Sequence, residues 1–133
     1  MALKQRSDGG PTGDALAFWS DLSQRFGGND LVLFELYNEP HTDTDTWMQG
    51  SQQYAGMLEM IDTVRQHAPN VPLVIAGAAD YGSTRHYCLS PCFSLLSPLL
   101  VRLFAAYGGA SLIQLHAELV KRGEERVIWN FHP

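Results

Sequence analysis

The sequence is poor in cysteine, in basic residues and in uninterrupted apolar runs, and each shortage excludes a class of protein. Its 133 residues include only two cysteines, Cys88 and Cys92, so neither a disulfide framework nor a four-cysteine zinc site can be built. Lys and Arg number 9 against 14 Asp and Glu, for a formal net charge of -5. Because phosphate binding needs a basic face, nucleic acid is not expected as a partner.

The sequence also shows neither the pattern of a secretory signal nor that of a membrane-spanning helix. The opening "MALKQRSDGGPTGD" is polar and lacks the apolar core of a secretory signal, so residues 1–13 are expected to form a flexible lead-in. The most apolar region, residues 88–107, contains Pro91, Pro98 and Arg102, which a membrane helix of about 20 residues tolerates poorly. We therefore expect no membrane partner.

Helical and strand patterns alternate along the rest of the chain, residues 14–133. Asp14 can cap a helix that Gly27 and Gly28, as left-handed residues, end. A second helix is expected from Asp45 or Thr46 to just before Pro69. A third carries Leu112, Ile113, Leu115, Leu119 and Val120 on its apolar side and ends at Gly123. Apolar runs at residues 31–40, 71–82 and 126–133 predict buried strands between these helices. The predicted class is α/β, with about three parallel strands in the order of the chain and flanking helices.

The stretch "VLFELYNEPH", residues 32–41, ends an apolar strand in an amide, a carboxylate and a proline. It resembles the strand-4 signature of glycoside hydrolase family 5, the cellulase and mannanase family of (β/α)8 barrels. The segments "YAGMLEMIDTVRQHAPNVPLVIAG" and "VIWNFHP" resemble the units that follow it, up to strand 6. The resemblance implies an incomplete (β/α)8 TIM barrel, since three strands do not close a barrel.

The same resemblance implies roles for individual residues. Glu39 would be the catalytic general acid/base, and Asn38 would bind the 2-hydroxyl of the sugar at the cleavage point. His132 falls on a histidine that lines the cleft, and Tyr81 ends the second strand near it. A positioned acid suits the chemistry, because a glycosidic oxygen leaves poorly unless it is protonated.

Each assignment has a structural alternative. Asn-Glu-Pro alone is a common strand-ending turn, and a lone histidine such as His132 is often structural. Trp47 and Trp129 could stack on sugars, but aromatic residues in helices and strands are usually core. The acidic pair Asp43 and Asp45 is most simply a solvated loop and a helix cap.

The chain departs from the family in its carboxylates. A retaining glycosidase needs a second carboxylate about 5 Å from the first. Glu35 is four residues from Glu39 along the strand, which places it roughly 13 Å away. The family's nucleophile ends strand 7, beyond the last strand of this sequence, so we expect the chain to stop before its nucleophile and to be inactive alone.

A second departure lies between the second strand and the third helix. Residues 83–105 are rich in Ser, Leu, Pro, Phe and Cys without a helical or strand period. Pyrimidine-rich codons supply all these residue types, so we interpret the segment as a retained intron. The alternatives are a loop insertion over the cleft and a short buried helix from Leu95 to Phe104.

The sequence thus predicts a glycoside hydrolase of retaining mechanism that cleaves O-glycosidic bonds of a β-linked polysaccharide, a glucan or a mannan. The alternative is a non-catalytic carbohydrate-binding remnant of the same fold. We expect no cofactor and no metal ion. Secretion is expected from the family resemblance. On the face of the sheet without helices, six apolar residues should await further strands: Leu33, Phe34, Val74, Ile75, Ile128 and Phe131.

Overall fold

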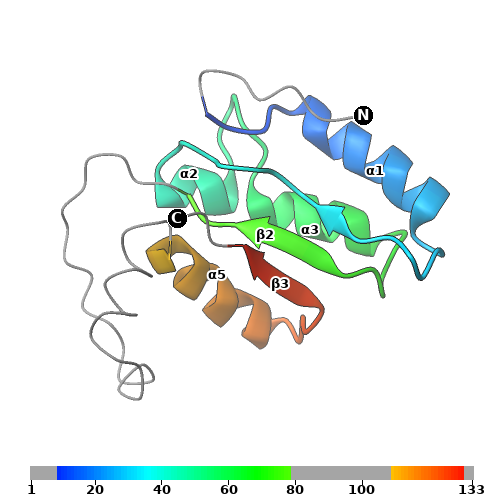
Figure 1. The fold of residues 1–133 in the computed structure, drawn as a ribbon. Helices are drawn as coiled ribbons and strands as arrows, with labels where there is room; N and C mark the ends of the chain where they lie inside the picture. The colour runs from blue at the N-terminus through cyan, green and yellow to red at the C-terminus, as the bar shows by residue number, and fades with distance from the viewer. Residues whose placement is uncertain (1–8, 79–108, 131–133) are drawn as a thin grey trace, which may run out of the picture.

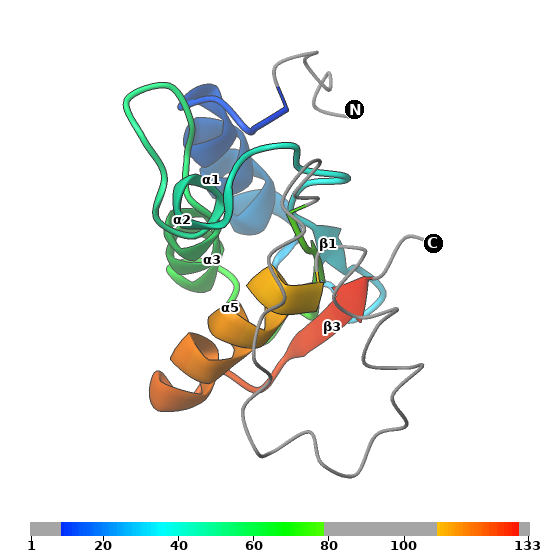
Figure 2. The same ribbon diagram turned by 90° about the vertical axis from the view of Figure 1, so that its left-hand side faces the viewer.

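The structure, a computed structural model, describes residues 9–78 and 109–130. Its elements are α1 (Asp14–Phe26), β1 (Phe34–Glu35), α2 (Thr44–Gln49), α3 (Met57–Arg65), β2 (Leu73–Ala76), α5 (Gly109–Lys121) and β3 (Val127–Asn130). The strands form one parallel sheet in the order β1-β2-β3, which confirms the predicted α/β class and strand order. Figures 1 and 2 show helices α1, α2, α3 and α5 on one side of this sheet.

The register decides which strand residues meet the helices. Phe34 pairs with Leu73, and Leu73 with Val127, so these three side chains share the helical face. They join one apolar core that extends through the helices. The core includes the fully buried Leu36, Met57, Met60, Val64, Leu73, Ile75, Leu112, Leu115 and Leu119. Burying a Leu or Ile side chain contributes about 1.5–3 kcal/mol, so the helical face holds the sheet in place.

The opposite face of the sheet is open among the described residues. The register row Glu35, Val74 and Ile128 lies there, and Ile128 is 50% exposed. Leu33, just before β1, is 55% exposed. The prediction was therefore right for Leu33, Val74 and Ile128, but wrong for Phe34 and Ile75, which are buried under the helices because side chains alternate along a strand. Phe131 lies outside the described residues.

The strand expected over residues 31–40 is much shorter than predicted. Just before β1, the Val32 amide donates to the Asn29 carbonyl, and the Leu31 amide donates to the Asn29 side chain. These turn hydrogen bonds keep Leu31 and Val32 out of the sheet, and Leu31 is 95% exposed. Apolar composition alone misplaced the strand boundary, because local side-chain bonds compete with the sheet.

The single helix predicted between Asp45 and Pro69 is two helices, α2 and α3. Gly50 ends α2 with a φ of 84°, a left-handed value that glycine tolerates. A Cβ on Gly50 would lie 2.7 Å from the Gly56 nitrogen, so the loop closes tightly on itself. The Gly56 amide then donates to Glu59 Oε2 at 3.0 Å and starts α3. Tyr54 consequently lies in the connecting loop and not on a helix face.

The ends of the other helices confirm and correct further details. Gly123, with a φ of 71°, follows α5 as predicted, whereas Val120 is 60% exposed and lies off the apolar side. Asp14 is the first residue of α1, and its cap is Gly13. Gly27 has a right-handed φ of -65°. Its small size matters for another reason, because a Cβ there would collide with Ala68 in the loop after α3.

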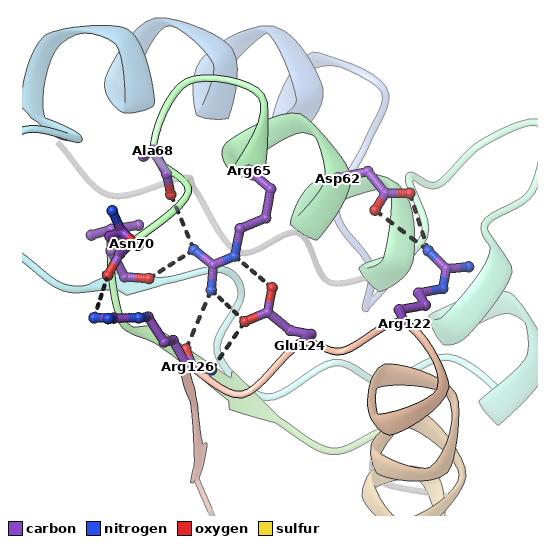
Figure 3. A network of polar contacts seen from close by, with 8 residues as sticks. Asp62, Arg65, Ala68, Asn70, Arg122, Glu124 and Arg126 are labelled. Carbon is purple, nitrogen blue, oxygen red and sulfur yellow. Dashed lines mark hydrogen bonds and ion pairs between the residues drawn. The ribbon is translucent and has the colours of Figure 1, made fainter.

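The amino-terminal edge of the sheet is closed by an ionic cluster (Figure 3). Arg65 makes a bidentate pair with Glu124, at 2.6 Å from Nε to Oε2 and 2.9 Å from Nη2 to Oε1. Its Nη1 also donates to the carbonyls of Ala68 and Val71. The side chains of Arg65 and Glu124 are 15% and 14% exposed. This cluster therefore joins α3 and the start of β2 to the loop before β3.

Candidate active site

The carboxyl ends of the three parallel strands lie at one edge of the sheet, where α/β proteins place their reactive groups. Asn38 and Glu39 follow β1 at this edge, and both are exposed. Pro40, directly after them, is fully buried. A buried proline with a restricted φ anchors the chain as it leaves the strand, while the amide and carboxylate before it face solvent.

Glu39 has an unusual backbone conformation. Among the residues that the structure describes, it is the single non-glycine residue with a positive φ, at 49°. A left-handed conformation is unfavourable for an L-residue with a side chain of this size and persists only where the surrounding chain imposes it. Such outliers cluster at functional sites, and this one coincides with the residue expected to be the general acid/base.

The amino-terminal segment supports the turn that follows Glu39. The His41 amide donates to the Gly9 carbonyl at 2.6 Å, and a Cβ on Gly9 would lie 2.5 Å from the His41 Cβ. The Ala55 amide donates to the Pro11 carbonyl at 2.8 Å. Gly9, Gly10 and Pro11 are buried. The expectation of a flexible lead-in over residues 1–13 is therefore wrong for this part, which is packed against the candidate site; residues 1–8 lie outside the described residues.

Asp43 begins α2 as its N-cap. Its Oδ1 accepts a hydrogen bond from the Thr46 amide at 2.9 Å. That backbone hydrogen bond, followed by one from the Thr46 side chain, lowers the pKa of Asp43 below its usual value. The helix therefore begins slightly earlier than Asp45 or Thr46, where it was expected to begin. The cap is Asp43, and Asp45 lies in the first turn of α2, where a negative charge is favourable.

The end of β2 is fixed by a hydrogen bond to α5. The Ala78 amide donates to the hydroxyl of Ser111 at 2.9 Å, and Ser111 is 1% exposed in the first turn of α5. The chain leaves β2 at Ala76 and β3 at Asn130, toward the edge that carries Glu39. Tyr81 and His132 follow these two strands but lie outside the described residues, as does the segment 83–105.

The two tryptophans that could have stacked on sugars have other surroundings. Trp47 is 2% exposed in α2 and belongs to the core, so it offers no stacking face. Trp129 packs edge-on against His116, with ring centroids 5.6 Å apart. Glu35 lies in β1, four residues before Glu39. Its side chain is on the open face of the sheet, in the same register row as Val74 and Ile128.

One contact of the site could not be predicted from the sequence. Trp19 in α1 donates its indole N–H to the Leu36 carbonyl at 3.2 Å, three residues before Glu39. The sequence pattern indicates only that Trp19 lies at a helical spacing from other apolar residues. A tryptophan in a buried position usually finds an acceptor for its N–H, but the sequence does not say which one.

Two features are absent from residues 9–78 and 109–130, a cluster of metal-ligating side chains and a membrane-spanning helix. These residues contain no group of three or more His, Cys, Asp or Glu side chains placed to hold a metal ion. No helix within the same ranges is both long and apolar enough to cross a membrane.

Comparison with known proteins agrees with the motif at the end of β1. The family described as Cellulase (glycosyl hydrolase family 5) matches residues 5–108, more than half of the chain. No solved structure matches the chain. The family match indicates glycosidase chemistry in general and a carbohydrate as the class of substrate. With Asn38, Glu39 and Pro40 at the carboxyl end of a parallel strand inside the matched region, the chain belongs to glycosyl hydrolase family 5 and contains part of its domain.

Proposed function

We propose that Glu39 is the general acid/base of a retaining glycosidase that cleaves O-glycosidic bonds in a β-linked glucan or mannan. The observation that carries the proposal is the placement of Glu39: exposed, left-handed, and at the carboxyl end of a parallel strand. A carboxylic acid held there can protonate the glycosidic oxygen as the bond breaks and then accept a proton from the incoming water.

Asn38 completes the acid/base end of the proposed site. Its exposed amide can bind the sugar 2-hydroxyl, a hydrogen bond that strengthens in the oxocarbenium-like transition state. Tyr81 and His132 remain proposed cleft residues, since they follow strands that end at the same edge. The proposal places the protein outside the cell, where polysaccharide is found.

The sheet fits a portion of a (β/α)8 barrel wall. Its strands are parallel and sequential, its helices lie on one face, and its other face displays Leu33, Val74 and Ile128. In a closed barrel that second face is the interior, filled by side chains of all eight strands. We propose that the nucleophilic carboxylate comes from a further strand of that barrel.

The first test compares the 133-residue chain with a protein in which it is joined to the remaining strands of the barrel. One positioned acid contributes about 10²- to 10⁴-fold, far short of a full glycosidase, so the chain alone should not hydrolyse soluble β-glucan or β-mannan measurably. Robust turnover by the chain alone would contradict the division of roles. Saturable binding of these polymers without turnover by the completed barrel would support the carbohydrate-binding remnant.

The second test isolates Glu39 in the completed protein. Glu39→Gln should lower turnover of the polysaccharide by about 10²- to 10⁴-fold, because an amide cannot protonate the leaving oxygen. Formation of the glycosyl-enzyme from an aryl glycoside with an acidic leaving group should be affected far less. Glu125→Gln, an exposed change at the opposite edge of the sheet, is the matched control. Equal activity of both variants on polysaccharide would reject Glu39 as the acid.

A further inference from the structure

The end of β1 is held by two different elements through a single residue. The Leu36 amide donates to the Val74 carbonyl of β2 at 3.2 Å, which is the last ladder bond before the site. The Leu36 carbonyl accepts the indole N–H of Trp19, at 3.2 Å, from the helical layer. The backbone at Leu36 is therefore fixed both by the sheet and by α1.

Water cannot easily replace the bond from Trp19. Leu36 is 1% exposed and Trp19 is 5% exposed, so both partners lie in the core. A buried carbonyl without a donor is costly, which makes this hydrogen bond worth more than one at the surface. The indole is itself held edge-on to Phe18, with ring centroids 5.1 Å apart, and tilted against Phe34 at 5.5 Å.

The strained residue lies between two anchored points. Glu39, with its φ of 49°, follows Leu36 by three residues. After Glu39, the buried Pro40 and the bond from the His41 amide to the Gly9 carbonyl hold the chain. A backbone conformation that is unfavourable by itself persists only when both flanks are fixed. Leu36 anchors the chain on the strand side. The sheet holds its amide through the Val74 carbonyl, and Trp19 holds its carbonyl.

We propose that Trp19 is a positioning residue for Glu39, acting through the Leu36 carbonyl. Loss of the indole N–H frees that carbonyl to rotate toward another donor. The turn at residues 37–39 then samples right-handed conformations of Glu39 as well as the left-handed one. We call the hydrogen bond from Trp19 to the Leu36 carbonyl the clamp. Its importance for catalysis rests on the acid/base role proposed for Glu39, but its effect on the backbone does not.

The chain offers a matched pair of variants for the test. Trp19→Phe and Trp47→Phe each replace a buried indole by a smaller ring in the same core. The Trp47 Nε1 has no hydrogen-bond partner among the described residues, so the second variant removes comparable bulk without removing a hydrogen bond. Any effect of core packing should appear in both variants, and any effect of the clamp only in the first.

The experiment is nuclear magnetic resonance on the ¹⁵N,¹³C-labelled 133-residue chain and its two variants. In Trp19→Phe the Leu36 carbonyl resonance should move upfield, as expected for a lost hydrogen bond. The three-bond scalar coupling between the amide proton and the α-proton of Glu39 should change from the value of a single left-handed conformer to an average over left-handed and right-handed conformers. Trp47→Phe should leave both signals at their wild-type values. An unchanged Glu39 coupling in a folded Trp19→Phe chain, or equal changes in both variants, would overturn the proposal.

A measurement on the unsubstituted chain covers the case in which Trp19→Phe does not fold. A scalar coupling across the hydrogen bond should connect the Trp19 indole nitrogen to the Leu36 carbonyl carbon, and its absence would also overturn the clamp. Neither readout requires hydrolysis. A completed enzyme that is indifferent to Glu39→Gln would thus reject the acid/base role while leaving the backbone clamp standing, so the two failures are distinguishable.

Discussion

The two edges of the sheet differ in the burial and bonding of their polar side chains. At the amino-terminal edge, Arg65 and Glu124 form a mostly buried bidentate pair, and Arg65 also donates to the backbone carbonyls of Ala68 and Val71 (Figure 3). At the carboxyl-terminal edge, Asn38 and Glu39 are exposed, and Glu39 has an unfavourable backbone conformation. The polar groups of the first edge bond to one another and to the backbone inside the protein, whereas those of the second face solvent on a backbone that is locally unfavourable.

This difference agrees with the general division of labour in parallel α/β folds. Residues at the amino ends of the strands chiefly serve stability, and residues at the carboxyl ends serve chemistry. If the division holds here, substitutions at the two edges should change stability in opposite directions. The predictions below are ordered from the largest expected change to the smallest.

The largest loss of stability is expected at the amino-terminal edge. Arg65→Met should lower the free energy of unfolding by about 3 kcal/mol, because it removes both side-chain donors of the mostly buried Glu124 carboxylate and one donor each of the Ala68 and Val71 carbonyls. Chemical denaturation monitored by circular dichroism measures it. Arg25→Met breaks an exposed pair with Asp21 on α1 and should cost less than about 1 kcal/mol.

A double variant sharpens the same prediction. Arg65→Met combined with Glu124→Met removes both charges and should be less destabilising than Arg65→Met alone, because a buried pair replaced as a unit leaves no stranded ion. Additive losses in the two variants would show that the two side chains act independently, and the amino-terminal edge would then not be the stabilising cluster described here.

An effect of the opposite sign is expected at the carboxyl-terminal edge. Glu39→Gly should raise the free energy of unfolding by about 1 kcal/mol, because glycine adopts a left-handed φ without the clash of a Cβ. Glu35→Gly, within β1, should instead lower it by about 0.5–1 kcal/mol. Thermal unfolding of both variants makes the comparison. Equal destabilisation by the two substitutions would show that Glu39 is not strained.

A smaller effect is a difference in acid sensitivity. Hydrogen bonds from Arg65 lower the pKa of Glu124 from 4.5, so the unfolded chain takes up this proton at a higher pH than the folded chain. The stabilisation is complete well above pH 4.5 and is lost as the pH falls through the lowered pKa. Glu124→Gln should therefore reduce the acid-induced loss of stability, measured by unfolding at pH 7 and at about pH 3.

Asp43 gives the corresponding comparison at the other edge. Its pKa is also lowered, by the Thr46 amide, so the sign of the pH dependence is the same. Since Asp43 is exposed and asparagine also caps helices well, Asp43→Asn should change the acid response less than Glu124→Gln. A larger change for Asp43→Asn would contradict the assignment of the stronger electrostatic anchor to the amino-terminal edge.

Much of this arrangement follows from local sequence pattern. Alternating helical and strand periods predicted the parallel sheet, its order and three of its supporting helical regions, since apolar periodicity records which side of an element is buried. Gly123 marked the end of α5 because a left-handed residue after a helix favours glycine. The order of amide, carboxylate and proline in residues 38–40 located the candidate site, and the family match to residues 5–108 agrees with it.

Contacts between distant segments could not be predicted in this way. The break between α2 and α3 depends on Gly50 and Gly56 packing against each other, and the burial of Gly9 depends on His41. The short length of β1 depends on bonds made by Asn29 on one side and Trp19 on the other. In each case the structure depends on which distant residue makes the contact, and local propensity and periodicity do not specify that residue.

The sequence by itself determined the class of fold, the family and the two residues at the centre of the candidate site, because these depend on local pattern and on residue type. Only the tertiary structure decided that Glu39 is left-handed, that Trp19 caps the carbonyl leading to it, and that Arg65 closes the opposite edge. The physical reason is that backbone strain and buried hydrogen bonds arise from segments distant in sequence that meet only once the core has formed.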